Sequence, residues 1–362
     1  TANRIDLVSD DKINIFKGTY STCEGTDPDW YLKSKKLHLD DGKNAGYATS
    51  PVLYFKDVPI LAAPAMTFPV KNERKSGFLP PTIGMTSKSG LEISVPYYFN
   101  LAPNYDLTLT PNLIARRGLQ LGAEARYLGS NYSGITYIEY LPNDKEADRD
   151  RYFLSSQHQQ AFNTGWSYYW NINSASDNEY PDDFSTPQNR NSLDRLLLRE
   201  GGISKSFGIW NATLRGTNYK VLQDEEAPII KPFDRLPQFS LYGGQANVGG
   251  FDWSIYGDLT RFWLSDSDLD QLPLQEQARG NRFIMKSEIS YPIISGGYFF
   301  TPKAILNIAK YDLDKSPYDT KSLTRVLPLD SMDAGLIFER DAPIFGRGMT
   351  QTLEPRLFYV YT

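Results

Sequence analysis

The feature that most constrains the fold is a long series of segments, from Asp106 to Thr362, in which apolar and polar residues alternate. In residues 119–127, LQLGAEARY, the apolar side chains fall on one face while Glu124 and Arg126 fall on the other, because successive side chains of a strand point to opposite sides. The core of a β-sandwich would not accept such charges unpaired. A barrel with lipid outside and water inside accepts both faces, so the pattern favours a large antiparallel transmembrane β-barrel.

The connections between these segments alternate in length. We count about fifteen strands from Leu79 onward, most of them near the ~9–11 residues that a tilted strand needs to cross a bilayer. The connections after odd-numbered strands are long and polar: 141–150, 175–191, 217–235, 265–280 and 312–330. Those after even-numbered strands are mostly short: 100–104, 129–133, 163–164, 204–208, 243–250, 295–297 and 342–348. Because outer-membrane barrels combine short periplasmic turns with long external loops, we expect the first strand to run outward from the periplasm.

Residues 1–70 follow a different pattern. Four strand-like runs, at 4–8, 12–20, 30–39 and 46–55, are separated by turn residues such as Asp40 and Gly42. They predict the C-terminal part of a soluble jelly roll or sandwich, with further strands upstream. The predicted division is 1–55 for this part, 56–78 for a proline-rich connector and 79–362 for the N-terminal portion of the barrel. Single-chain bacterial barrels have an even number of strands, so we expect the barrel to be incomplete in this sequence.

Composition narrows the class of protein further. No apolar run approaches the ~18–20 residues of a membrane helix. The net charge of -5 gives no general affinity for nucleic acid, so we predict no nucleic-acid partner. Aromatic residues make up 14% of the chain, which suits the interfacial girdles of a membrane barrel but also suits strands in general.

Catalytic and metal sites are not predicted. The chain has 2 histidines, His38 and His158, and neither lies in a sequence context that supplies a triad or a zinc site. The aspartates at 266, 268 and 270 begin like a calcium loop, but the glycine at its sixth position is missing and Gln277 stands in place of the bidentate glutamate. We therefore predict no enzyme activity, no metal and no cofactor, and interpret residues 265–280 as a solvated loop.

Two prolines interrupt the pattern at the start of the barrel. Pro81 falls in the first predicted strand and Pro96 in the second. Proline has no N–H to donate to a ladder, so one in each arm of a hairpin weakens the pairing of those arms. Taken alone, the same residues are better explained by a strand start at Pro81 and a kink at Pro96.

Residues 74–118 resemble the LptD family of lipopolysaccharide (LPS) assembly proteins, also called OstA or Imp. The resemblance is carried by short pieces in family order along nearly the whole chain: Cys23 with Trp30, Val58-Pro59-Ile60, Arg74-Lys75-Ser76-Gly77-Phe78-Leu79, Pro96-Tyr97-Tyr98, Asn100-Leu101-Ala102-Pro103-Asn104, Asp106 with Thr108 and Thr110, Arg117-Gly118, Arg126-Tyr127-Leu128, Asp234-Arg235-Leu236-Pro237 and residues 350–356, TQTLEPR. Each piece alone is weak, whereas the ordered set is specific.

The resemblance implies a protein of the Gram-negative outer membrane with its N-terminal part in the periplasm. It implies a jelly roll, a very large barrel plugged by the lipoprotein LptE, and a bridge through LptA that delivers lipopolysaccharide. The barrel assembly machinery would fold the protein, and lipopolysaccharide would leave into the outer-membrane lipids through a lateral gate at the first strand. A passive porin or transporter is the alternative that the alternation alone leaves open.

The resemblance also implies roles for particular residues. Pro81 and Pro96 match the family's gate prolines, and Cys23 matches a cysteine that forms a disulfide with the C-terminal part of the barrel; a lone buried thiol is the alternative for Cys23. An apolar run that leads into the barrel is a candidate path for acyl chains, or else ordinary core packing: Leu53, Phe55, Ile60, Leu61, Met66 and Phe68.

Overall fold

The computed structural model describes residues 2–21, 23, 28–68, 70–71, 74–184, 195–224, 226–344 and 347–362. It is 70% strand and 3% helix, with large antiparallel sheets, which confirms the predicted all-β class. The described residues do not by themselves close a barrel. They also contain no helix long and apolar enough to span a membrane. The chain divides into two compact units, Thr1–Gly129 with Ile135–Leu154, and Ser130–Gly134 with Ser155–Thr362.

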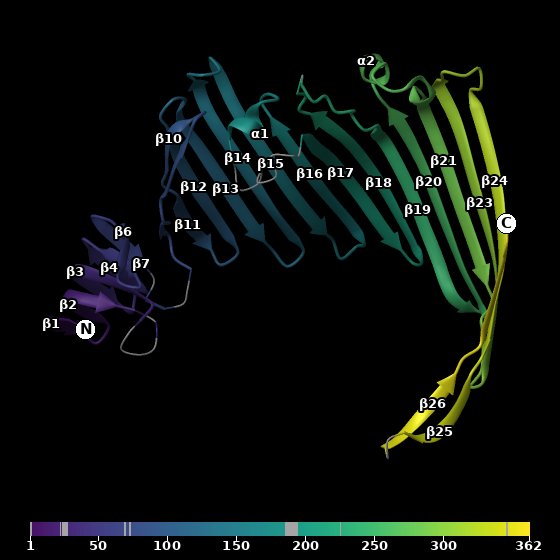
Figure 1. Ribbon diagram of the computed structural model, residues 1–362, viewed down its shortest axis with the longest axis horizontal. Helices are drawn as coiled ribbons and strands as arrows, with labels where there is room; N and C mark the ends of the chain where they lie inside the picture. Colours follow the sequence, from purple (N-terminus) through teal and green to yellow (C-terminus); the bar gives the residue numbers. More distant parts are fainter. Residues whose placement is uncertain are drawn as a thin grey trace. The chain divides into compact units, whose positions relative to one another are not determined.

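The first unit begins with a seven-stranded antiparallel sheet (Figure 1). Its strands are β1 (Arg4–Ser9), β2 (Lys12–Tyr20), β3 (Trp30–Asp40), β4 (Ala45–Thr49), β5 (Val52–Phe55), β6 (Val58–Ala62) and β7 (Ala65–Phe68). Their order is β1-β2-β3-β4-β7, with β5 paired to β3 and β6. The sequence placed residues 56–78 in a connector, but Val58–Ala62 and Ala65–Phe68 form β6 and β7 of this sheet, and Met66 and Phe68 of β7 pack against its core.

The core of this sheet is small. Leu32, Leu37 and Ala48 are buried, and partly buried apolar side chains from β2, β3, β5 and β7 surround them. On β4, Gly46 lies directly beneath the ring of Phe68, and a β-carbon at this position would come within 2.4 Å of two ring carbons. Glycine is therefore what allows β7 to lay its phenylalanine across β4.

The rest of the first unit is the start of the barrel portion. It contains β8 (Gly77–Phe78), β9 (Thr82–Thr86), β10 (Gly90–Ser94), β11 (Tyr97–Ala102), β12 (Tyr105–Ile114) and β13 (Gly118–Leu128). β12 and β13 pair in an unbroken antiparallel register from Tyr105↔Tyr127 to Ile114↔Gly118. The strands β14 (Tyr132–Asp144) and β15 (Arg149–Ala161) contribute residues to both units.

The second unit is a ladder of long antiparallel strands (Figure 1). They are β16 (Trp166–Ala175), β17 (Leu196–Phe207), β18 (Trp210–Val221), β19 (Asp234–Val248), β20 (Phe251–Trp263), β21 (Arg279–Ser290), β22 (Ile293–Ile294), β23 (Tyr298–Lys315), β24 (Ser322–Leu336) and β27 (Arg356–Tyr361). Short helices α1 (Tyr180–Asp183), α2 (Asp266–Leu269) and η1 (Leu274–Glu276) lie in the long loops.

One short connection differs from its prediction. Residues 342–348 were expected to be a turn, but they form part of a further hairpin, β25 (Phe338–Ile344) with β26 (Arg347–Leu353). This hairpin keeps the register of β24 with β27, since Phe338 pairs with Leu353 and Gly335 with Arg356. The sequence pattern did not predict this extra length.

The polarity of the barrel strands is the reverse of that in a water-soluble domain. On β13, Leu119 and Leu121 are 57% and 48% exposed, whereas Gln120 between them is 4% exposed. On β20, Leu259 is 51% exposed while its neighbour Asp258 is 2% exposed. The apolar face is therefore the outer one and the polar face is covered, as the alternation predicted.

Candidate functional site

The first hairpin of the barrel portion is divided into two parts. β9 pairs with β10 from Thr82↔Ser94 onward, and β8 pairs with β11 through Phe78↔Tyr97. From Phe78 to Thr82 the first arm advances four residues, while the second arm advances three from Ser94 to Tyr97. The extra residue on the first arm is a bulge, and it shifts the register by one residue.

Both prolines singled out in the sequence lie at this division. We expected Pro81 within the first strand and Pro96 within the second, but Pro81 directly precedes β9 and Pro96 lies between β10 and β11. The physical reason is that a residue without an N–H cannot continue a ladder, so each proline ends a stretch of pairing. Across the division, the amide of Leu79 donates a hydrogen bond of 2.9 Å to the carbonyl of Pro96. The gate role of the two prolines stays a prediction.

The two prolines face different neighbours. The Val95 amide donates to a carbonyl on β12. Because successive residues of a strand direct their backbone N–H and C=O groups to opposite neighbouring strands, Ser94 and Pro96 direct theirs toward the first arm. Thr82 is paired with Ser94 and faces it, so Pro81, one residue earlier, faces away from β10. Pro96 thus withholds a donor from the hairpin itself, whereas Pro81 withholds one from the far side of β9.

All five residues of β9 are exposed. The apolar side chains among them are Ile83, 69% exposed, and Met85, 78% exposed. The first strand beyond the prolines therefore offers an accessible apolar face.

The six predicted acyl-path residues do not share one environment. Leu53, Met66 and Phe68 pack against the buried core of the first sheet. Phe55 and Ile60 are exposed, by 48% and 57%. Leu61 lies in β6, but its side chain is outside the part of the chain that the structure describes.

Cys23 lies in the segment between β2 and β3. It is partly buried, and its amide donates a 3.0 Å hydrogen bond to Ser21 Oγ. It is the single cysteine of the chain, so no disulfide forms within this sequence. The predicted bond to a cysteine elsewhere stays a prediction.

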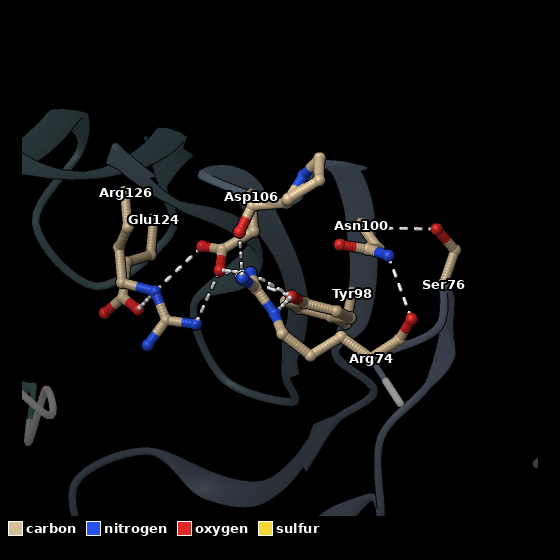
Figure 2. Close-up of polar contacts among 8 residues, drawn as sticks. Arg74, Ser76, Tyr98, Asn100, Asp106, Glu124 and Arg126 are labelled. Carbon is tan, nitrogen blue, oxygen red and sulfur yellow. Dashed lines mark hydrogen bonds and ion pairs between the residues drawn. The ribbon is translucent and has the colours of Figure 1, made fainter. Parts of the chain in front are cut away.

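A polar cluster that sequence reasoning missed joins the connector to the barrel strands (Figure 2). Its centre is Asp106 on β12, whose side chain is 7% exposed. Arg126 on β13 donates to both carboxylate oxygens, from Nε at 2.8 Å and from Nη2 at 3.0 Å. From the connector, Arg74 donates to the same carboxylate, and Tyr98 on β11 donates to it at 3.2 Å. We call Arg74, Tyr98, Asp106 and Arg126 the Asp106 cluster.

Further bonds tie the connector backbone to β11. The amide of Asn100 donates to Ser76 Oγ at 2.8 Å, and its side-chain amide donates to the carbonyl of Arg74 at 2.9 Å (Figure 2). Arg74 Nε also donates to the Tyr98 hydroxyl at 2.7 Å. The connector is thus fixed to the polar face at the end of β11 by both main-chain and side-chain contacts.

Part of this cluster could have been found from the sequence. Counting residues away from the turn at 115–117 along both strands places Asp106 opposite Arg126. The two side chains then form a cross-strand ion pair. Arg74 could not be placed in this way, because the bulge at 79–81 breaks the count between the connector and β11.

The described residues contain no group of three or more His, Cys, Asp or Glu that could hold a metal. In the 265–280 loop, Asp266 lies 3.3 Å from Arg279 and 3.2 Å from Lys315. The hydrogen bond from Lys315 and the nearby positive charges lower the pKa of Asp266 below its ordinary value. The aspartates at 266, 268 and 270 each form an ion pair with a lysine or arginine of the chain.

Two family models match the chain. The model described as "LPS transport system D" matches residues 149–362, which is more than half of the sequence, and the model described as "LptD protein" matches residues 47–203. The chain belongs to the LptD family. The LptD resemblance drawn from short sequence pieces is thereby confirmed.

Several LptD relatives match the chain along its length. The LPS-assembly protein LptD of Ralstonia nicotianae is 43% identical over 368 residues, which cover 100% of this chain and 44% of the relative. The protein of the same name from Bordetella parapertussis is 42% identical over 372 residues, covering 99% and 46%. That from Burkholderia ambifaria is 41% identical over 368 residues, covering 100% and 45%. The chain spans less than half the length of these LptD relatives.

Proposed function

We propose that the chain is part of an outer-membrane translocon that transports lipopolysaccharide and assembles it into the outer leaflet. The observation that carries the proposal is the reversed polarity of the strands in a member of the LptD family. Exposed leucines such as Leu121 and Leu259 suit contact with lipid. The polar residues on the opposite face of the strands suit the wall of a water-filled lumen. Residues 79–362 would form this part of the barrel.

The first sheet would receive the lipid in the periplasm. Its apolar interior, which includes Leu53, Met66 and Phe68, is suited to acyl chains. Phe55, Ile60 and Leu61 would continue the path toward the first hairpin. Because lipid A is amphipathic, its acyl chains would follow this apolar surface while its sugars follow the polar wall of the barrel.

The first hairpin would be one side of a lateral gate. Pro81 and Pro96 support this, because Pro96 removes a hydrogen-bond donor from the pairing within the hairpin. Pro81 removes a donor from the opposite edge of the first arm. The exposed apolar face of β9 would then meet acyl chains as they pass into the outer-membrane lipids.

The partners that the proposal requires are the lipoprotein LptE as plug, the bridge protein LptA and the barrel assembly machinery. Cys23 would form its disulfide with the part of the barrel beyond this sequence, in the oxidising periplasm. Non-reducing electrophoresis of the full-length protein tests this bond: reduction should change the mobility of the wild type and leave that of Cys23→Ser unchanged. The proposal involves no cofactor and no bond chemistry.

The deciding experiment is depletion of the full-length protein in cells. Newly made lipopolysaccharide is followed with a modifying enzyme restricted to the outer surface. We expect loss of surface lipopolysaccharide and its accumulation behind the outer membrane. Normal surface delivery would overturn the proposal and leave a passive porin as the explanation of the barrel.

A further inference from the structure

The Asp106 cluster lies at the junction between two parts that the proposed function uses differently. The connector leaves the first sheet after Phe68 and enters the first hairpin at Gly77. Arg74 and Ser76 lie between these points, and both are bonded to β11 or β12. The cluster therefore acts on the covalent link between the sheet that would receive lipid and the hairpin that would release it.

The strength of the attachment changes along the hairpin. Below the bulge, the connector and β8 are held by the Asp106 carboxylate, by Asn100 and by the edge-to-face packing of Phe78 on Tyr97, with ring centroids 4.8 Å apart. At the bulge, the Leu79 amide bonds to the Pro96 carbonyl. Above it, every residue of β9 is exposed. The root of the hairpin is held by side-chain bonds to β11 and β12, whereas its outer part is held by the pairing of β9 with β10.

The chemistry of the cluster suits an anchor. A carboxylate that is nearly covered and accepts from two guanidinium groups is a charge-assisted arrangement with fixed geometry. Arg126 binds it with two nitrogens from the neighbouring strand, so the carboxylate is held in place before Arg74 arrives. Arg74 then brings the connector to a site that β12 and β13 have already built.

We propose that Asp106 is a positioning residue that fixes the connector to the barrel wall, so that opening is confined to the hairpin beyond Leu79. This inference rests on the proposed function and adds to it. The outlet of the first sheet stays aligned with the hairpin while the outer part of β9 moves. Loss of the anchor lets the connector swing away, and lipid stalls before the hairpin.

The test uses the full-length protein in cells with its partners, and photo-crosslinking to lipopolysaccharide at two positions. One probe replaces Met66 in the first sheet and the other replaces Ile83 in β9. In Asp106→Asn, we expect crosslinking at position 83 to fall at least threefold and crosslinking at position 66 to be kept or to rise. Asp106→Glu keeps the charge and should recover part of the loss.

The matched control is Asp333→Asn. Asp333 on β24 accepts from Arg356 on β27, with Nε at 2.7 Å, and is likewise a cross-strand pair, but it lies outside the connector and the first hairpin. Both crosslinks should be unchanged in this variant. If Asp106→Asn behaves as Asp333→Asn does, the anchor is refuted. If the wild type crosslinks lipopolysaccharide at neither position, the proposed function itself fails.

Assembly of each variant is checked by its heat-dependent electrophoretic mobility. If Asp106→Asn does not assemble, Tyr98→Phe decides the question, because it removes a hydroxyl bonded to Arg74 and Asp106 and keeps the ring. About a twofold shift from the outer to the inner crosslink supports the anchor. Unchanged crosslinks in an assembled Tyr98→Phe protein overturn it.

Discussion

The amide of Leu79 donates a hydrogen bond of 2.9 Å to the carbonyl of Pro96, and the reciprocal bond cannot form because Pro96 has no N–H. A hydrogen-bonded pair in an antiparallel ladder normally exchanges two such bonds. The hairpin is thus held by half of the usual contact at the level where its register also shifts. This relationship locates the weak point of the first hairpin to a single residue pair.

Pro96→Thr should strengthen the hairpin. The new N–H faces Leu79 and restores the second bond, which is worth about 0.5–1.5 kcal/mol. We expect slower hydrogen exchange at the Leu79 amide and slower delivery of lipopolysaccharide to the cell surface. Pro302→Thr, a matched change on the distant strand β23, should alter neither measurement.

Pro81→Thr should act on a different contact. Its new N–H points away from β10, so hydrogen exchange at Leu79 should stay as in the wild type while export slows. Export and envelope permeability that are unchanged in both the Pro81 and the Pro96 variants would contradict the gate. Slower exchange at Leu79 in the Pro81 variant would contradict the assigned direction.

Gly46→Ala should destabilise the first sheet. The new methyl group would meet the Phe68 ring at 2.4 Å, so the ring or β7 must move, and overpacking of this kind costs about 1–3 kcal/mol. Limited proteolysis of the full-length protein should show faster cleavage in residues 30–68. Gly42→Ala is the control, because its nearest neighbours lie 3.5 Å away. Equal cleavage of the two variants would show that the Phe68 ring can move aside without loss of stability.

Leu259→Arg tests the assignment of the outer face. If Leu259 meets lipid, an arginine there costs about 2–4 kcal/mol near the bilayer midplane. Ser254→Arg places the same side chain on the polar face of the same strand and should cost much less. Urea titration of full-length protein in phospholipid vesicles compares them. A larger loss in Ser254→Arg would mean that the two faces are assigned the wrong way round.

Asp40 should make the first sheet sensitive to acid. Burial alone would raise its pKa, but the Lys43 amide at 2.9 Å and the Lys12 ammonium at 3.6 Å outweigh burial and lower the pKa. A carboxyl with a lowered pKa stabilises the fold above its unfolded pKa, near 4, and this stabilisation is lost as the pH falls through the folded value.

Asp40→Asn should therefore exchange amide hydrogens faster than the wild type in β2 and β4 at pH 7. The difference should shrink as the pH falls below about 4, the ordinary pKa of an aspartate, and through the lowered pKa of Asp40. Asp10→Asn serves as a control on an exposed turn. A difference between Asp40→Asn and the wild type that persists at low pH would show that the asparagine acts through packing instead of charge.

The sequence predicted the barrel strands well because their alternation is strong and local. Residues 119–127, in which the alternation was read, lie within β13, and their leucines are on the exposed face. Pro81 and Pro96 were expected within strands, with a strand start and a kink as the alternative, because apolar residues continue on both sides of each proline. The β25–β26 hairpin was missed because its residues around Gly348 have the composition of a turn.

The Asp106 cluster was only partly accessible from the sequence. Asp106 and Arg126 are related by a regular turn, whereas Arg74 is 32 residues from Asp106 and separated from it by the bulge. The predicted acyl path shows the opposite problem. Its residues are alike in composition, but Phe68 packs in the core while Ile60 is exposed, and this difference depends on which strands pair.

The bulge at 79–81 also sets a rule for sequence change in this family. Phe78 and Ile83, one even and one odd in the numbering, share a face only because of the extra residue between them. A single deletion there would exchange the lipid and water faces of one arm, whereas the outer loops can change length without that effect. Insertions and deletions of one residue should therefore be rare in this segment and common in loops such as 265–280. Counting such insertions and deletions in an alignment of LptD sequences tests this expectation.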